Sequence, residues 1–401
     1  MTKDIFERVF VVIGSEYNYM PVGANYLAQA LSENGETVIY LEQPSFLSFV
    51  KNPLYFWRIF KKFFYLSLNK RQVNIITITS KILPIRKEIF LKKIGLGFLY
   101  QLQEKLLNLE INLIKRKLKK KYSDGSVIVL FNDPFSYKVA KKFKQSIIIF
   151  RACDRYDKYP GWENQEERIK GIYIKAISES NIVLATSDFI YDEIIQFRKE
   201  KVFLFPNGYQ DFKQNTLFVP SELRKIPQPI IGFVGAVNDW IDIKLIEEAT
   251  KNRPQYSFVI IGPVLNKKIQ TLKTLKNIYI LGYKKRYILS SYYSNFDVAI
   301  APFIINELSK GINPIKFYEY LAFGLPVVST SIKEAEKFKD LIYIATNTEE
   351  FIRKIDEALQ ERNSQLKEKR KKFALENSWN NRAKVLIQIV KEWKIKLNNL
   401  L

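Results

Sequence analysis

The stretch from residue 9 to residue 41 decides the fold, because two apolar runs flank an amphipathic segment there. The first run is Val9-Phe10-Val11-Val12-Ile13-Gly14 and the second is Thr37-Val38-Ile39-Tyr40-Leu41. Between them, residues 22–34 repeat apolar side chains at helical spacing and stop at Gly35. Short apolar runs predict buried strands, and the segment between them predicts a helix. Strand, helix and strand in succession are typical of a parallel sheet covered by helices.

The same alternation continues along the chain and predicts two α/β domains. Further strands are expected at 126–131, 146–150, 181–186 and 202–205, and then at 229–235, 257–262, 278–282, 296–302 and 326–330. A turn signal, Pro206-Asn207-Gly208, separates the two series. The length of 401 residues suits two domains of about 200 residues each. We therefore expect an N-terminal domain at 1–207, a C-terminal domain at 208–378 and an amphipathic helix at 379–401.

The composition excludes several classes of enzyme. The chain has no histidine, which excludes an imidazole base and histidine-ligated metal sites, so a general base must be Asp or Glu. The single Cys153 excludes an internal disulfide and favours a reducing compartment. No run approaches the ~20 apolar residues of a membrane-spanning helix. The apolar run at 9–14 is too short, and its flank too acidic, for a secretory signal.

The charge of the chain indicates an anionic partner. Lys and Arg number 64 against 41 Asp and Glu, a net charge of +23. Residues 46–121 alone hold 18 cations and 3 anions, a local charge of +15, and aromatic residues alternate with the cations over 49–71. This pattern predicts an interfacial segment on an anionic membrane. Nucleic-acid binding, or a core helix with a solvated basic face, are the alternatives. The residues expected to touch the membrane or the acceptor are Phe56, Trp57, Lys61, Lys62 and Phe63.

The strongest local motif covers residues 313–330, Asn-Pro-Ile-Lys-Phe-Tyr-Glu-Tyr-Leu-Ala-Phe-Gly-Leu-Pro-Val-Val-Ser-Thr. It predicts a helix that begins near Pro314, ends at Gly324 and leads into a strand. Lys316 and Glu319 are three residues apart and share a face of this helix. A helix N-terminus favours phosphate, and Lys316 would add a charge to it. The alternative is a surface ion pair between Lys316 and Glu319.

This motif resembles the donor-binding motif of GT-B glycosyltransferases, whose common form is Asn-Pro-Leu-Lys-x-x-Glu-Tyr-Leu-Ala-x-Gly-x-Pro-Val-Val. Other segments match in order: 235–240 the glycine loop, 281–284 the nucleobase loop, 302–306 the donor loop, 202–208 the hinge and 378–379 the start of the last helix. The resemblance implies two Rossmann-like domains that face each other across a cleft. It also implies a C-terminal helix that crosses back to the N-terminal domain.

The resemblance further implies a nucleotide-sugar site in the C-terminal domain. Lys316 would bind the diphosphate and Glu319 the ribose hydroxyls. The full set of expected donor-binding residues is Gly235, Asn238, Lys284, Phe303, Asn306, Asn313, Lys316 and Glu319. No metal and no cofactor are expected, because helix N–H groups and Lys316 can neutralise the leaving diphosphate.

The expected mechanism is inverting. Many retaining members of the family carry a glutamate eight residues before the position of Glu319, and Gly311 stands there in this chain. Residues 147–156 resemble a segment of the subgroup that contains xanthan-type glucuronosyltransferases and teichuronic-acid transferases. This resemblance implies Asp154 as the catalytic base, placed in a loop that follows a parallel strand.

Two alternatives to this assignment of Asp154 stay open. Asp133 also follows a predicted strand and is the second candidate for the base. Asp154 could instead pair with Arg151 or Arg155 as part of the loop structure.

The expected function is transfer of a sugar from a nucleotide sugar, expected to be a UDP-sugar, to a lipid-linked saccharide in bacterial surface polysaccharide synthesis. We expect a cytoplasmic protein, peripheral on the inner face of the cell membrane, with no nucleic-acid partner. The alternatives are a retaining transferase of the same fold and a non-catalytic basic nucleic-acid-binding protein. A sugar-nucleotide 2-epimerase of this fold is disfavoured by the absence of histidine.

Overall fold

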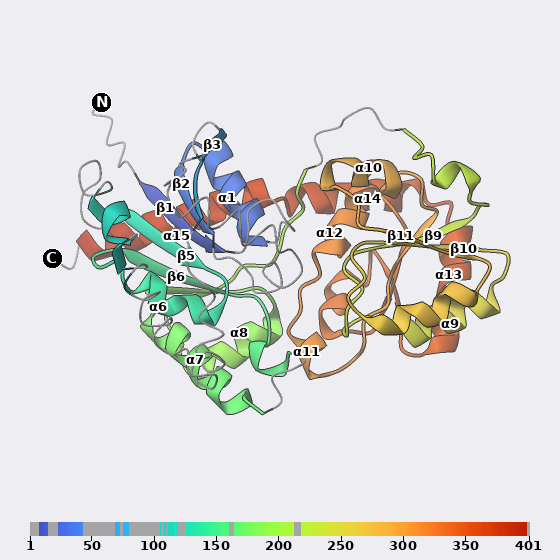
Figure 1. Ribbon diagram of the computed structural model, residues 1–401, viewed down its shortest axis with the longest axis horizontal. Helices are drawn as coiled ribbons and strands as arrows, with labels where there is room; N and C mark the ends of the chain where they lie inside the picture. Colours follow the sequence, from blue (N-terminus) through green and yellow to red (C-terminus); the bar gives the residue numbers. More distant parts are fainter. Residues whose placement is uncertain are drawn as a thin grey trace.

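The computed structural model describes residues 8–14, 23–42, 69–72, 75–79, 105, 108–109, 111–116, 118, 126–159, 164–211 and 218–398. These residues form two α/β domains, each built on its own sheet (Figure 1). Among the described helices, none combines the length and apolar character that crossing a bilayer requires. The residues predicted to touch the membrane lie outside the described ranges: Phe56, Trp57, Lys61, Lys62 and Phe63.

The N-terminal domain has an eight-stranded sheet with the order β3-β4-β2-β1-β5-β6-β7-β8. Its strands are β1 (Val9–Gly14), β2 (Thr37–Glu42), β3 (Asn69–Gln72), β4 (Ile75–Thr79), β5 (Val127–Phe131), β6 (Ile147–Ala152), β7 (Ile182–Ala185) and β8 (Val202–Leu204). All neighbouring strands pair in parallel except β3 with β4. The central strands are continuous apolar runs because the sheet is covered on both faces.

The C-terminal domain has a six-stranded parallel sheet with the order β11-β10-β9-β12-β13-β14. Its strands are β9 (Ile230–Val234), β10 (Ser257–Ile261), β11 (Ile278–Gly282), β12 (Val298–Ala301), β13 (Val327–Thr330) and β14 (Tyr343–Ala345). The order runs outward in both directions from β9 and β12. The sheet therefore has a switch point between these two strands, where ligands of open α/β sheets bind.

Helices cover both sheets. They are α1 (Gly23–Glu33), α6 (Tyr137–Ala140), α7 (Glu166–Glu179), α8 (Asp188–Ile195), α9 (Ile243–Asn252), α10 (Arg286–Tyr293), α11 (Glu307–Lys310), α12 (Ile315–Ala322), α13 (Thr348–Gln360), α14 (Ser364–Glu376) and α15 (Trp379–Asn398). Successive residues of β1 enter opposite cores: Phe10 packs in the core that contains α1, and Val11 in the core that contains α7 and α8. This alternation is the period of two expected for a strand.

The last helix, α15, belongs spatially to the N-terminal domain, although it follows the C-terminal domain in sequence (Figure 1, red). Trp379, Leu386 and Val390 are buried in the core shared with α1 and β1. Apolar residues at helical spacing give α15 the face that it buries there.

The chain crosses between the domains twice, and the two crossings lie side by side. Tyr209 and Ser378 form a parallel bridge, and the N–H of Trp379 donates to the carbonyl of Tyr209 (2.8 Å). A Cβ atom on Gly208 would lie 2.9 Å from the backbone nitrogen of Trp379, so a side chain here would collide with backbone. Glycine at 208 therefore permits the close pairing that defines the hinge.

Candidate functional site

The carboxyl ends of the C-terminal strands form an edge lined by backbone. Gly235 follows β9 and Gly262 follows β10, and the N–H of Gly235 donates to the carbonyl of Ile261 (2.8 Å). A Cβ atom on Gly262 would lie 2.0 Å from the carbonyl oxygen of Gly235, and Gly262 has φ +141°. Only glycine fits this position. The absence of side chains lets a ligand approach the backbone at the switch point of the sheet.

Lys316 brings a positive charge to this edge from the first turn of α12. Its Nζ lies 4.2 Å from the ring centroid of Phe233 and 4.9 Å from that of Phe303. A Cβ atom on Gly235 would lie 2.9 Å from the same Nζ, so the ammonium group occupies the space beside this glycine. Burial lowers the pKa of Lys316 to about 7, although the negative charge of Glu319 opposes the shift. Lys316 is thus a cation held in an apolar setting at the edge of the sheet.

The start of α12 adds backbone donors to the same place. Pro314 occupies the N-cap position, and no side chain caps the helix. The first N–H groups of a helix have no partner inside it and carry the positive end of its dipole. Within the part of the chain that the structure describes, Lys316 makes no hydrogen bond and no ion pair. Together, the helix start and Lys316 can bind a diphosphate.

Glu319 is buried one turn further along α12. Its carboxylate accepts hydrogen bonds from Arg286 Nη1 (2.6 Å) and from the hydroxyl of Tyr293 (2.8 Å). The guanidinium of Arg286 also lies 4.5 Å from the ring centroid of Tyr26 in α1 of the other domain. Glu319 therefore does not form the surface ion pair with Lys316 that was the alternative interpretation. The carboxylate of Glu319, which was predicted to bind the ribose hydroxyls, is held instead by Arg286. Arg286 in turn contacts Tyr26 of the N-terminal domain.

The remaining predicted donor residues have structural contacts around this centre. The side chain of Asn238 accepts the N–H of the next residue (2.9 Å) and orders the glycine loop. Asn306 caps α11 through a reciprocal pair of hydrogen bonds. Lys284 forms an ion pair with Glu222, in the segment that precedes β9. Phe303 lies under the Lys316 ammonium, as described above.

Asn313 connects the motif to the hinge. Its Oδ1 accepts the N–H of Asn207 (2.8 Å), its carbonyl accepts from Asn207 Nδ2 (2.6 Å), and its own Nδ2 donates to Glu334 (2.7 Å). Asn207 Oδ1 accepts in turn from Arg151 Nη2 (2.5 Å) at the end of β6. Arg151 is only 1% exposed, and its guanidinium lies 5.2 Å from the ring of Trp379. The donor motif, the hinge and the end of β6 are therefore joined by one hydrogen-bonded chain.

Asp154 lies in the loop after β6, where the sequence predicted the base. Its Oδ2 accepts a hydrogen bond from the hydroxyl of Tyr159 (3.0 Å). Burial raises the pKa of Asp154 to about 6, while the hydrogen bond from Tyr159 and the charge of Arg151 oppose the shift. A carboxyl group with a pKa near 6 can accept a proton at neutral pH and is a stronger base than an exposed aspartate.

Asp133 and Arg155, which figure in the alternative interpretations, have other partners in the structure. Asp133 accepts the N–H of Phe135 (3.0 Å) and the hydroxyl of Ser136 (2.8 Å), so both its oxygens cap the 3-10 helix that begins at residue 134. Arg155 pairs with Asp157 and Glu193 rather than with Asp154. Asp133 therefore has a local structural role, and the carboxylate of Asp154 is not part of an ion pair with Arg155.

Gly311 lies against the N-terminal domain. Its carbonyl accepts a hydrogen bond from the hydroxyl of Ser187 (2.9 Å), and a Cβ atom on it would lie 3.1 Å from Arg155 Cγ and 3.4 Å from Ile190 Cγ1. A glutamate at this position would need space that the interface fills. A larger side chain at position 311 would therefore require Arg155 and Ile190 to shift.

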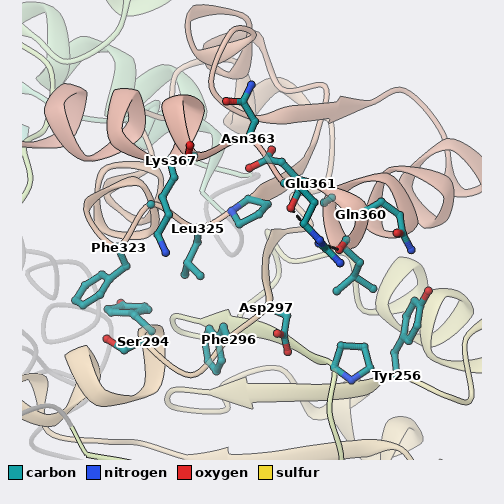
Figure 2. A pocket seen from close by; sticks show the side chains of 18 residues that line it. Tyr256, Ser294, Phe296, Asp297, Phe323, Leu325, Gln360, Glu361, Asn363 and Lys367 are labelled. Carbon is teal, nitrogen blue, oxygen red and sulfur yellow. Dashed lines mark hydrogen bonds between the residues drawn. The ribbon is translucent and has the colours of Figure 1, made fainter.

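A cavity of about 710 Å³ lies at the opposite edge of the C-terminal sheet (Figure 2). Its walls include Pro229, Asp297 and Pro326, which directly precede β9, β12 and β13. The amino ends of the strands, and not the carboxyl ends, therefore border this cavity. It is separate from the edge that carries Gly235 and Lys316.

Sequence reasoning missed four residues at the domain interface. Arg286 and Tyr293 hold Glu319, Tyr159 holds Asp154, and Asn207 joins the hinge to Asn313. Arg286 had one signal, the basic run that follows Gly282. Asn207 lies in the predicted turn and hinge, but its partner was not predicted, because Asn207, Tyr293 and Tyr159 meet their partners only through the tertiary fold.

Comparison with known proteins supports a glycosyltransferase relationship. Residues 228–361 match the model of the family described as glycosyl transferases group 1. A relative in Bacillus subtilis, named "Putative teichuronic acid biosynthesis glycosyltransferase TuaH", is 26% identical over 232 residues. That match covers 54% of this chain and 58% of the relative, so the chain spans little more than half of the curated relative it matches.

Solved structures share the whole architecture at low sequence identity. The Anabaena protein HepE, solved in complex with UDP and glucose, is 11% identical, with a TM-score of 0.65 over 96% of this chain and 100% of its own. An Escherichia coli trehalose-6-phosphate protein bound with UDP-2-fluoro glucose is 13% identical, with a TM-score of 0.63 over 96% and 99%. A glycosyltransferase from Rickettsia africae is 17% identical, with a TM-score of 0.63 over 96% and 98%. The chain therefore has the GT-B fold of these structures, and residues 228–361 are similar to the glycosyl transferases of group 1.

Proposed function

We propose that the protein transfers a sugar from a UDP-sugar to a lipid-linked saccharide at the cytoplasmic face of the membrane, in bacterial surface polysaccharide synthesis. The observation that carries the donor half is the Lys316 ammonium, held beside Gly235 at the uncapped start of α12. Two structural neighbours are described with UDP or a UDP-sugar bound, which supports this class of donor. The relative named for teichuronic acid biosynthesis supports a surface polysaccharide as the product.

The proposed reaction is a single displacement that inverts the anomeric carbon. Asp154 takes the proton of the acceptor hydroxyl while the bond between the sugar C1 and the diphosphate oxygen breaks. Lys316 and the first N–H groups of α12 receive the charge that develops on the leaving diphosphate. No metal is required for this step. Support for inversion comes from the glycine at position 311, where many retaining members carry a glutamate, and from the raised pKa of Asp154.

The donor site is tested by titration calorimetry of UDP into the wild type and into Lys316→Ala. We expect the substitution to weaken binding by about 1.5–3 kcal/mol, the range for a hydrogen bond to a charged group. The affinity of the wild type for UDP should fall as the pH rises above 7. The pKa of Lys316 in the protein without ligand is about 7, and the anionic diphosphate prefers the protonated ammonium.

Lys251→Ala is the matched control, since Lys251 lies on the surface of α9 and pairs with Glu247. Its affinity for UDP should equal that of the wild type. If Lys316→Ala and the wild type bind UDP with equal affinity, the diphosphate does not bind at this site. Loss of UDP binding in EDTA would contradict the metal-free proposal.

A further inference from the structure

Tyr159 lies beside the proposed base and bonds directly to it. It follows the short 3-10 helix Tyr156–Lys158, which itself follows β6. Its hydroxyl donates to Asp154 Oδ2 at 3.0 Å. A hydrogen bond to one carboxylate oxygen fixes the rotation of the carboxyl group and leaves the other oxygen to accept a proton.

The ring of Tyr159 is held from both domains. It stacks on Tyr156 with a centroid separation of 5.6 Å and an angle of 21°. The ring also contacts Trp240 of the C-terminal domain, at a centroid separation of 6.3 Å and an angle of 76°, an edge-to-face geometry. Trp240 is in the loop that begins at Gly235, and its carbonyl accepts the N–H of Ile304 at 2.9 Å. The loop at the donor edge therefore packs on the residue that orients Asp154.

We propose that Tyr159 is a positioning residue for Asp154 and that Trp240 holds it in place across the domain interface. The inference rests on the proposed function, in which Asp154 is the base. It adds that the base on the acceptor side is assembled by a contact from the donor domain. Proton transfer is then efficient only when the glycine loop is in the position seen here.

The groups that surround Asp154 define the controls. Among the described residues, Arg151, Cys153, Asp133 and Tyr156 are further ionisable groups in electrostatic range of this site. Among them, the hydroxyl of Tyr156 donates to the carbonyl of Asn132 (3.1 Å) and not to Asp154. Tyr156→Phe therefore removes a neighbouring hydroxyl from the same aromatic stack without touching the proposed hydrogen bond.

The experiment is the pH profile of nucleotide-sugar turnover between pH 5 and 8.5 in the full chain. The substrates are UDP-glucose, UDP-N-acetylglucosamine and UDP-glucuronate, with hydrolysis as the readout. Tyr159→Phe removes a hydrogen-bond donor that stabilises the ionised carboxylate of Asp154. The midpoint of the acidic limb should therefore rise by about one pH unit. At pH values below this midpoint, turnover should be about tenfold lower than in the wild type. Trp240→Leu should raise the midpoint of the acidic limb as well, but by less than Tyr159→Phe does. Tyr156→Phe should keep the wild-type midpoint, and both Tyr159→Phe and Tyr156→Phe should keep the wild-type affinity for UDP.

The outcomes separate this inference from the proposed function. If Asp154→Asn retains wild-type turnover, the proposed base is wrong and the role of Tyr159 falls with it. If Asp154→Asn is inactive but Tyr159→Phe has the wild-type midpoint, the inference alone is overturned. A wild-type midpoint in Trp240→Leu, together with a shifted one in Tyr159→Phe, would overturn the part of the proposal that crosses the interface.

Discussion

Two ionisable side chains near the domain interface have pKa values moved far from their ordinary range by burial. The pKa of Lys316 falls to about 7 and that of Asp154 rises to about 6. In both cases the fold disfavours the charged form that the proposed chemistry uses. Structural side chains gain nothing from such settings, whereas a diphosphate and an acceptor hydroxyl would make use of them. The two shifts make Lys316 and Asp154 candidates for a functional role.

Asp154→Asn should stabilise the protein at neutral pH. The pKa in the folded state, about 6, lies above the usual unfolded value of about 3.9. The fold therefore favours the protonated form, an advantage that is complete below pH 4 and lost as the pH rises through 6. Asparagine cannot ionise and keeps an acceptor for Tyr159, so we expect a gain of about 1–2 kcal/mol at pH 7.5 after allowance for partial exposure.

Urea unfolding of both proteins at pH 7.5 and pH 4.5 measures this effect. The difference in free energy of unfolding should be largest at pH 7.5 and about a third as large at pH 4.5. A variant that is less stable than the wild type at pH 7.5, or a difference that does not depend on pH, would show that the carboxylate is not destabilised by the fold.

Among the elements, every strand expected from an apolar run is present, including the edge strands β8 and β11, whereas β3, β4 and β14 were not predicted. Strands such as β1 and β9 are apolar runs that end at a glycine, and the structure places them within two residues of the expected bounds. β3 and β4 were not predicted. They lie in the basic segment 46–121, which was interpreted from its charge and not as strands. β14 has only three residues and pairs on one side, so its sequence carries little strand signal.

The candidate site could be predicted as positions but not as contacts. The motif around α12 placed Lys316 and Glu319 one turn apart, and the structure agrees. The partners of Glu319 come from α10, 26 and 33 residues earlier, and Asn207 meets Asn313 across 106 residues. Such pairs depend on how two sheets are brought together, which neither periodicity nor spacing encodes. The contact between Tyr159 and Trp240 was missed for the same reason.

For the molecule as a whole, the charge is concentrated in the N-terminal part, with +15 over residues 46–121 against +23 in total. This half contains Asp154 and would receive the acceptor. We predict that the protein sediments with vesicles of phosphatidylglycerol, less so at high salt, and much less with phosphatidylcholine alone. Each lysine near an anionic membrane contributes about 1 kcal/mol to the free energy of binding, and screening by salt reduces this contribution.

Lys61→Glu with Lys62→Glu should weaken this sedimentation and leave UDP binding unchanged. The matched control reverses two exposed lysines of the C-terminal domain, Lys251→Glu with Lys372→Glu, and should sediment like the wild type. Equal sedimentation with both kinds of vesicle, or with neither, would contradict an electrostatic role for the basic segment.

The anomeric configuration of the first product tests the proposed inverting, nucleotide-sugar-dependent transfer with Asp154 as base. Proton NMR of the wild type with an α-linked UDP-sugar should show the β anomer first, before mutarotation. Asp154→Asn should reduce this turnover by about 10²-fold or more while UDP affinity stays the same. A first product that keeps the α configuration, or an Asp154→Asn variant as active as the wild type, would contradict the account.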